Sequence, residues 1–320
     1  MFDPVLVPLD GSLLAECVLP HAVAIARAFD AKVILLRVLD KNQASEKAQL
    51  FDLLNWQISK TGAKLYLEKI SARLQKTGLR IETAVLEGLV AESITEFALN
   101  RGIKLIILSS HGRSGVSQWE ISSVSQKIIL SAPASVLIIR AYQPAANESF
   151  ERQYAHIAVP LDGSRRAENV LPMVTLLARR NQSRIHIVHV VKTPEMARQM
   201  PLSREDVELS DRIVARNQEE ATRYLDQLRT HSPLDELDVQ TRLMTSDNAA
   251  AALHELAEKE NIDMVALSAH GYSGNNQWPY GSMVNNFILY SKVPLLIVQD
   301  LPLKDEPVLV DMASRERTEH

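Results

Sequence analysis

A stretch of six residues occurs unchanged in both halves of the chain: Val7–Ser12 and Val159–Ser164 both read Val-Pro-Leu-Asp-Gly-Ser. A second matched pair follows, because Ser109-Ser-His-Gly112 in the first half corresponds to Ser268-Ala-His-Gly271 in the second. Two landmarks that recur in the same order and at nearly the same spacing predict a duplicated unit. The repeat is far longer than the roughly 20–50 residues of a solenoid repeat, so each copy is a whole domain.

The length of 320 residues suits two domains, each of about 100–150 residues. Hydrophobic residues make up 46% of the chain, enough for two packed cores, and a net charge of −4 shows no basic footprint for nucleic acid. The single cysteine excludes an internal disulfide framework. No signal peptide is evident, and apolar runs such as 105–108 are too short to span a bilayer, so we expect a cytoplasmic protein without membrane contact.

Short apolar strands alternate with amphipathic helices along each half. In the first half we expect strands at 5–9, 33–39, 81–86, 105–108 and 136–139, and helices at 14–29, around 63–74, at 91–100 and at 121–130. The second half repeats this order, with strands at 157–161, 184–191, 239–244, 264–267 and 295–298, and helices at 166–180, 207–228, 249–259 and 282–290. Pro20 and Pro172 predict a kink or a first-turn proline in the first helix of each half.

Strands that are apolar on both faces and alternate with helices indicate a parallel sheet covered on both sides. We therefore predict an α/β fold of two tandem doubly wound, Rossmann-like domains, each with a five-stranded parallel sheet flanked by four helices. The domains cover residues 1–140 and 154–300. Residues 141–153 form the linker, and the charged residues 301–320 form a flexible tail.

Two polar segments of each half are expected at one edge of its sheet. Asp10 and Asp162 end the first strand of their halves, and residues 109–115 and 268–274 follow the fourth strand. In open α/β sheets, ligands bind beyond the carboxyl ends of the strands, where the strand order reverses. The second of these segments is rich in Gly and Ser and leads into a helix, whose free N–H groups favour an anion.

The second half resembles the universal stress protein family. Ser268-Ala-His-Gly271, nine further residues and then Gly281-Ser282 are similar to the family signature Gly-x-x-Gly, nine residues, Gly-Ser/Thr. The motif Pro-Leu-Asp-Gly-Ser resembles the same family, and the resemblance covers both halves. It implies an adenine-nucleotide alpha hydrolase-like fold. It also implies ATP as the ligand, with Mg or Mn at the phosphates. From the residues themselves, we expect no catalytic residue and no metal ligand, because no base and no set of metal ligands is visible.

The resemblance assigns nucleotide-binding positions in both copies. In ATP-binding members the signature loop holds the phosphates and ribose, while the strand-one Asp region and the end of strand two hold adenine. The matching positions in the second half are Pro160, Leu161, Asp162, Val190, Ser268, His270, Gly271, Gly281 and Ser282. The corresponding positions in the first half are Pro8, Leu9, Asp10, Val38, Ser109, Gly112, Ser122 and Ser123.

Both copies depart from the signature. Its first Gly is replaced by Ser109 and by Ser268, and its third, kept as Gly281, is replaced by Ser122 in the first half. If that position needs a positive φ, serine there costs about 1–2 kcal/mol; if it needs close approach of a phosphate, a side chain obstructs it. Glu120 adds a negative charge nearby, which Arg113 would offset. The second copy is therefore the expected nucleotide site, and the first is expected to be degraded.

Structural interpretations of the same residues stay open. The strand-one aspartates can serve only as turn formers, with Ser12 and Ser164 capping the next helix. A histidine before a glycine in a tight loop, such as His111 or His270, more often bonds to backbone than catalyses. His186 and His189 are three apart on a strand, so they face opposite sides and cannot form a metal pair.

Three functions follow from these patterns. The first is a non-enzymatic, ATP-binding regulator of the stress response, with the nucleotide in the second half. The alternative is a structural or protein-interaction module that binds no nucleotide, and the third is a slow nucleotide hydrolase. The chain contains no P-loop, no Gly-x-Gly-x-x-Gly after a strand and no Gly-x-Ser-x-Gly elbow, which disfavours an enzyme.

The last strand of each half leaves an apolar edge that no later strand of that half covers. The resemblance implies that single-domain relatives dimerise through this strand, antiparallel across a two-fold axis. We therefore expect residues 136–139 and 295–298 to pair within the chain. A further homodimer would then use other surfaces.

Overall fold

A computed structural model describes residues 2–40, 49–111, 121–141, 150–194, 203–230, 234, 236–272 and 279–300. Parts of two predicted segments, residues 142–149 of the linker and all of the tail at 301–320, lie outside this set. The same holds for Gly112, Arg113 and Glu120.

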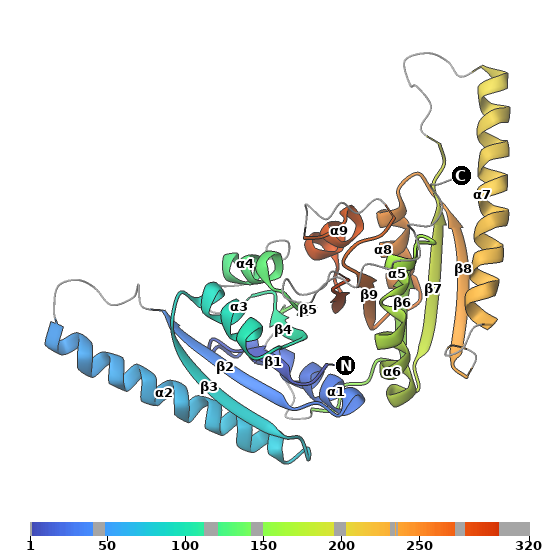
Figure 1. Ribbon diagram of the computed structural model, residues 1–320. Coiled ribbons are helices and arrows are strands. Elements are labelled where there is room, and N and C mark those ends of the chain that lie inside the picture. Colours follow the sequence, from blue (N-terminus) through green and yellow to red (C-terminus); the bar gives the residue numbers. More distant parts are fainter. Residues whose placement is uncertain are drawn as a thin grey trace, which may run out of the picture.

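The elements follow the predicted order in both halves (Figure 1). The first half comprises β1 (Val5–Pro8), a 3₁₀ turn (Ala15–Val18), α1 (Leu19–Phe29), β2 (Val33–Asp40), α2 (Gln49–Gln75), β3 (Ile81–Gly88), α3 (Val90–Asn100), β4 (Leu105–Ser109), α4 (Ser123–Ser131) and β5 (Ser135–Ile139). The second comprises β6 (His156–Pro160), α5 (Arg165–Glu168), α6 (Leu171–Asn181), β7 (Arg184–Val191), α7 (Arg204–Thr230), β8 (Asp238–Thr245), α8 (Ala249–Lys259), β9 (Met264–Ser268), α9 (Ser282–Tyr290) and β10 (Leu295–Val298).

Proline divides the first helical segment of each half. Pro20 and Pro172 lie in the first turn of α1 and α6, and each helix is preceded by a separate short turn, the 3₁₀ turn or α5. A first-turn proline gives up no intrahelical hydrogen bond, because the N–H groups of that turn have no partner within the helix. The expectation of a first-turn proline is confirmed.

The strands of the described ranges lie in one sheet, in the order β3-β2-β1-β4-β5-β10-β9-β6-β7-β8. Neighbouring strands within each half are parallel, so each half is a doubly wound α/β unit, as predicted. The strand order reverses between β1 and β4 in the first half, and between β6 and β9 in the second. These reversals are the points at which such folds bind ligands.

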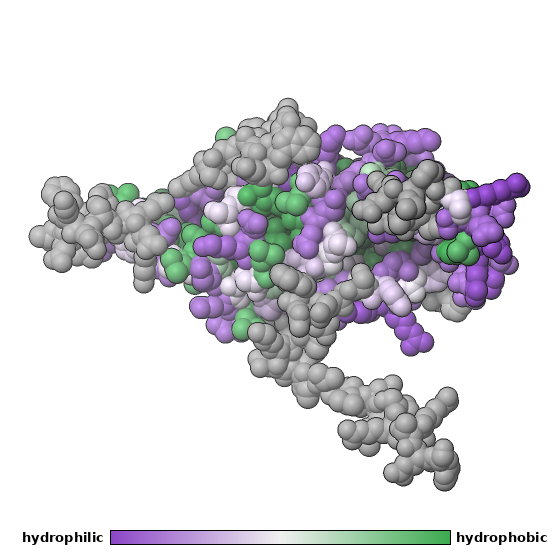
Figure 2. Space-filling model, turned by 90° about the horizontal axis from the view of Figure 1, so that it is seen from above, coloured by the Kyte–Doolittle hydropathy of each residue, from purple (hydrophilic) through white to green (hydrophobic). Residues whose placement is uncertain are grey.

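Helices cover both faces of the sheet, and one apolar core fills each face. On β1, Val5 and Val7 point into the core beneath α1 and α6, while Leu6 points into the other, beneath α3, α4, α8 and α9. Each core contains residues of both halves. The exposed surface of α7 carries i,i+4 ion pairs such as Arg216–Glu220, together with the exposed apolar side chains Val207, Leu209 and Ile213. Figure 2 shows mostly hydrophilic residues at the right-hand end, with a small hydrophobic patch among them, and more hydrophobic residues near the middle of that face.

The two halves join along β5 and β10, which pair antiparallel, with Leu295 opposite Ile138 and Ile297 opposite Val136. Hydrogen bonds between the two halves lie beside this seam, the paired strands β5 and β10. The Tyr280 hydroxyl donates to the carbonyl of Ile129 at 2.7 Å. The Arg140 guanidinium donates to two carbonyls at the end of α9, one of them at 2.8 Å.

A buried histidine adds a second contact between the halves. Nδ1 of His21 in α1 is hydrogen-bonded to the hydroxyl of Tyr154, just before β6, at 2.6 Å, and both side chains are buried. Burial, with a smaller effect from the nearby Arg152 guanidinium, lowers the pKa of His21 to about 3. The imidazole is therefore neutral in the folded protein at neutral pH.

Acid should weaken the fold through this histidine. The pKa of His21 is lower in the folded than in the unfolded chain, so its contribution is complete above about pH 6.5 and is lost as the pH falls toward 3. Between pH 7 and pH 5 the unmodified protein should lose about 2 kcal/mol more unfolding free energy than the His21→Gln variant. Urea denaturation at both pH values measures the difference. Equal losses in the two proteins would contradict this assignment.

Candidate functional site

A cavity of about 310 Å³ opens at the strand-order reversal of the second half, between the carboxyl ends of β6, β7 and β9 and the starts of α8 and α9. The structure brings together around it every residue predicted for the second site: Pro160, Leu161, Asp162, Val190, Ser268, His270, Gly271, Gly281 and Ser282. Sequence reasoning missed other residues of the wall, among them His189 and Lys192. Both lie close to Val190 in the sequence, near the end of β7. This proximity is the only feature of the sequence from which their place in the cavity wall could have been predicted.

Asp162 connects the first turn of the second half to the signature loop. Its Oδ1 accepts hydrogen bonds from the backbone N–H and the hydroxyl of Ser164, at 3.0 and 2.6 Å. Its Oδ2 accepts the backbone N–H of Tyr272, just after the signature His-Gly, at 2.6 Å. Burial raises the pKa of this carboxyl, but these hydrogen bonds outweigh burial and hold the pKa below its ordinary value. Asp162 is therefore ionised at neutral pH.

The turn-former interpretation also holds for these residues. Ser164 caps α5, because its hydroxyl accepts the backbone N–H of Ala167 at 3.1 Å. Asp10 and Ser12 repeat this arrangement in the first half, with bonds of 2.8 and 2.6 Å between them. The aspartate thus shapes the turn in both halves, and in the second half it also holds the loop.

Gly271 has no room for a side chain. A Cβ at this position would lie 2.1 Å from Oδ2 of Asp162 and 3.1 Å from its Cγ. A side chain at the second glycine of the signature would therefore force the Asp162 carboxylate or the loop to move.

The signature histidine bonds to a carboxylate. Nδ1 of His270 lies 2.7 Å from Oδ1 of Asp300, and Oδ2 of Asp300 accepts a hydrogen bond from Nε of Arg166 at 2.7 Å. The His270 and Asp300 side chains are fully buried. In the first half, Nδ1 of His111 instead bonds to the Ser110 hydroxyl at 2.9 Å. In both loops, Nδ1 of the signature histidine therefore bonds to a side chain.

The third signature glycine lies in extended backbone. Gly281 is the N-cap of α9 with φ −71°, and its counterpart Ser122 has φ −55°. A Cβ on Gly281 would lie no closer than 3.7 Å to any other atom. Neither a positive φ nor a clash within the protein excludes a side chain here, so the strain anticipated for Ser122 does not arise.

The two positions nevertheless differ chemically. Ser122 uses its own hydroxyl to accept the backbone N–H of Ser125 at 3.1 Å, which occupies one donor of the first turn of α4. Gly281 has no side chain to supply such a cap, and no other side chain in the described ranges accepts an N–H group of the first turn of α9. Ser268 also contributes a buried hydroxyl that has no hydrogen-bond partner among the described residues.

The first half keeps a cavity of similar size, about 380 Å³. All residues predicted for the first site line it apart from Gly112, which is outside the described set: Pro8, Leu9, Asp10, Val38, Ser109, Ser122 and Ser123. Because the space remains, loss of the cavity does not distinguish the first site from the second; their lining residues do.

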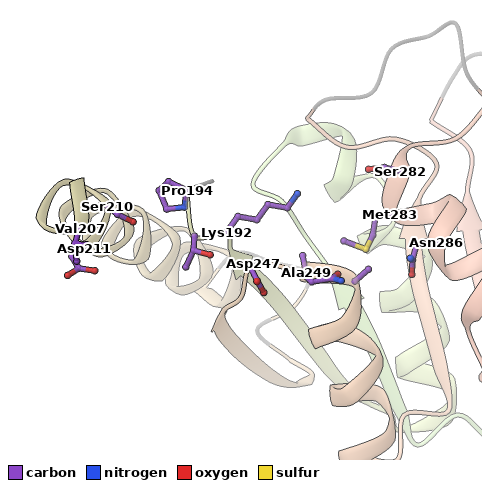
Figure 3. Close-up of a pocket in the computed structure, with 13 residues that line it drawn as sticks. Lys192, Pro194, Val207, Ser210, Asp211, Asp247, Ala249, Ser282, Met283 and Asn286 are labelled. Carbon is purple, nitrogen blue, oxygen red and sulfur yellow. The ribbon is translucent and has the colours of Figure 1, made fainter. Parts of the chain in front are cut away.

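A third, larger cavity of about 590 Å³ adjoins the second-half site (Figure 3). It extends from the end of β7 and the start of α8 to the first part of α7, and it shares Lys192, Ala249, Ser282 and Met283 with the smaller cavity. Figure 3 shows Val207, Ser210 and Asp211 of α7 on one side, and Met283 and Asn286 of α9 on the other.

The two histidines of β7 have different neighbours. Nε2 of His186 bonds to Nδ1 of His156 at 3.0 Å, whereas His189 lines the smaller cavity and packs edge-on against Tyr224. Burial lowers the pKa of both imidazoles.

The described part of the chain contains no group of three or more His, Cys, Asp or Glu side chains placed to hold a metal. In the same ranges, no helix combines the length and apolar character needed to cross a membrane.

Comparison with known proteins identifies the family. The universal stress protein family model matches residues 1–140 and 153–299. Universal stress protein MJ0531 of Methanocaldococcus jannaschii is 28% identical over 142 residues, which covers 44% of this chain and 83% of that protein. Universal stress protein MJ0577 of the same organism is 27% identical over 156 residues, covering 44% and 96%. Each relative thus matches a segment the size of one half.

A solved universal stress protein from Archaeoglobus fulgidus has the same fold over both halves. The match covers 94% of this chain and 100% of that one, with a TM-score of 0.64 at 17% identity. Because the family model matches twice and accounts for nearly all of the described residues, the chain belongs to the universal stress protein family, as a member with two tandem domains.

Proposed function

We propose that the chain is a non-enzymatic regulator of the stress response that binds one adenine nucleotide, ATP, in the second-half cavity. Family membership supports a stress-response protein. The main support for nucleotide binding is that the strand-one motif and the signature motif meet at one cavity, at the point where the strand order reverses. The first turn of α9, which no described side chain caps, offers backbone N–H donors to a phosphate in the same cavity.

The cavity has two ends that suit the two parts of a nucleotide. Asp162 and Val190 lie at the ends of β6 and β7, where the family resemblance assigns the adenine. Gly281 and Ser282 lie at the start of α9, where the positive end of the helix dipole favours phosphate. A divalent ion such as Mg²⁺ would arrive with the phosphates. It would neutralise their charge without adding a protein ligand.

Identification of the small molecules released when the purified protein is denatured tests this proposal directly. An adenine nucleotide near one equivalent per chain supports it. Release of none, together with no binding of added ATP, would favour the alternative of a protein-interaction module. Phosphate release at typical enzyme rates, about 1 per second or more, would favour a hydrolase.

Replacement of Gly281 by aspartate should abolish ATP binding without unfolding the protein. Aspartate is a preferred N-cap and the backbone there is extended, so α9 should be stable. Its carboxylate would occupy the phosphate end of the cavity and repel the ligand. Isothermal titration calorimetry should give about one site for the unmodified chain and none for Gly281→Asp. The matched Ser122→Asp variant should bind as the unmodified chain does; loss of binding there would place the nucleotide in the first half.

A further inference from the structure

A single lysine stands where the two second-half cavities meet. Lys192 follows β7 directly, two residues after Val190, and it lines both cavities. Figure 3 shows its side chain reaching across the opening toward Ser282 and Met283 at the start of α9. Among the described residues that line either cavity, Lys192 is the only lysine or arginine.

The other charged side chains that line these two cavities are carboxylates, which do not attract a phosphate. Of the described groups, only Lys192 and the start of α9 can do so. Both oxygens of Asp162 already accept hydrogen bonds that hold the loop. Asp211 and Asp247 line the larger cavity beyond the lysine and would repel a phosphate there. Lys192 forms no ion pair with any described residue. A polyphosphate leaving the smaller cavity would therefore be most stable at the junction, between the ammonium group and Ser282.

The first half carries the opposite charge at this position. β6 pairs with β7 in the same register as β1 pairs with β2, which makes Asp40 the counterpart of Lys192. Asp40 lines the first-half cavity, as Lys192 lines the second. The two copies thus present an ammonium and a carboxylate at the same place relative to the helix start.

We propose that Lys192 determines specificity in the second site, by selecting ligands that carry a polyphosphate over the bare nucleoside. This inference rests on the proposed nucleotide function, and it adds the residue that interacts with the phosphate groups of the ligand. Lys192 is exposed to solvent, so its attraction is partly screened by water and salt. The effect should therefore be moderate, dependent on salt and confined to the charged part of the ligand.

The test compares adenosine and ATP on the same variants by calorimetry, with and without Mg²⁺. Lys192→Gln should weaken ATP binding about tenfold at low ionic strength and leave adenosine binding within about twofold. Lys192→Asp should weaken ATP binding further. The loss should shrink in 1 M salt, where charges interact over only about 3 Å. Lys259→Gln, at the far end of α8, removes the same charge away from the cavity and should change neither affinity.

Each result has a definite meaning. Equal weakening of adenosine and ATP by Lys192→Gln would show a structural role and overturn the inference, as would unchanged ATP binding. If the unmodified protein binds neither ligand, the proposed nucleotide function itself is wrong. If it binds adenosine and ATP equally well, the proposed nucleotide binding is supported, but the proposed selection of polyphosphate ligands by Lys192 is wrong.

Discussion

Replacement of Gly271 by alanine should detach the signature loop from the first turn of the second half. The added Cβ would lie 2.1 Å from Oδ2 of Asp162, so that carboxylate must rotate or the loop must move. Either change breaks the bond from the Tyr272 backbone N–H, and a hydrogen bond to a charged group contributes about 1.5–3 kcal/mol. We expect the unfolding free energy to fall by about 2 kcal/mol and ATP binding to be lost.

Two further variants make this prediction specific. Gly281→Ala places its Cβ in ordinary contact, at least 3.7 Å from its neighbours, so its unfolding free energy should stay near that of the unmodified protein. Combining Gly271→Ala with Asp162→Ala removes the clashing atoms, so the double variant should be more stable than the sum of the two single losses predicts. If the losses of unfolding free energy of the two single variants simply add up in the double variant, the contact with Asp162 is not the reason for a glycine at position 271.

Lysine at Ile138 and Ile297 should separate the halves. Both side chains are almost completely buried in the seam between β5 and β10. Each substitution loses the burial of an apolar side chain and forces a charge into a site without a partner, at a cost of about 4 kcal/mol or more. X-ray scattering should show one compact particle for the unmodified protein. The double variant should give an expanded one, with a much lower denaturation midpoint.

The matched control places the same lysines on the surface. Leu130 and Leu289 occupy equivalent positions at the ends of α4 and α9 and are 50% and 45% exposed. Lysine at both should leave the scattering profile and the midpoint close to those of the unmodified protein. A compact, fully stable Ile138→Lys/Ile297→Lys protein would mean that this seam does not hold the halves together in solution. The proposal that any homodimer uses other surfaces would then fail as well.

Much of the architecture could be predicted because it depends on short-range patterns. Apolar runs that alternate with amphipathic helices specify a parallel sheet, and the repeat shows that this happens twice. The carboxyl ends of parallel strands meet at one edge, so residues as distant as Asp162 and Gly271 could be expected in one cavity before their contacts were known. The topology, and not any single motif, makes such an inference secure.

What sequence reasoning missed depends on tertiary contacts or on comparing the copies position by position. The sequence around His270 gives no sign of its hydrogen bond to Asp300, or of the bond from Arg166 to the same carboxylate. These three residues come together only in the folded chain. The sequence left open whether the third signature glycine serves a positive φ or the close approach of a phosphate. An N-cap residue is normally extended, and Gly281 follows that rule, so the positive φ is excluded. Lys192 was readable in principle, because aligning the two copies sets it against Asp40.

The antiparallel seam between β5 and β10 also bears on how the two sites can evolve. In a dimer of identical chains, any substitution appears in both subunits, so the two sites change together. Here the same kind of junction joins two stretches of one polypeptide, and no described residue lines both the second-half and the first-half cavity. A mutation can therefore alter one site while the other keeps its chemistry. Asp40 opposite Lys192, and Ser122 opposite Gly281, are such divergences, and they leave a symmetric scaffold with two unlike pockets.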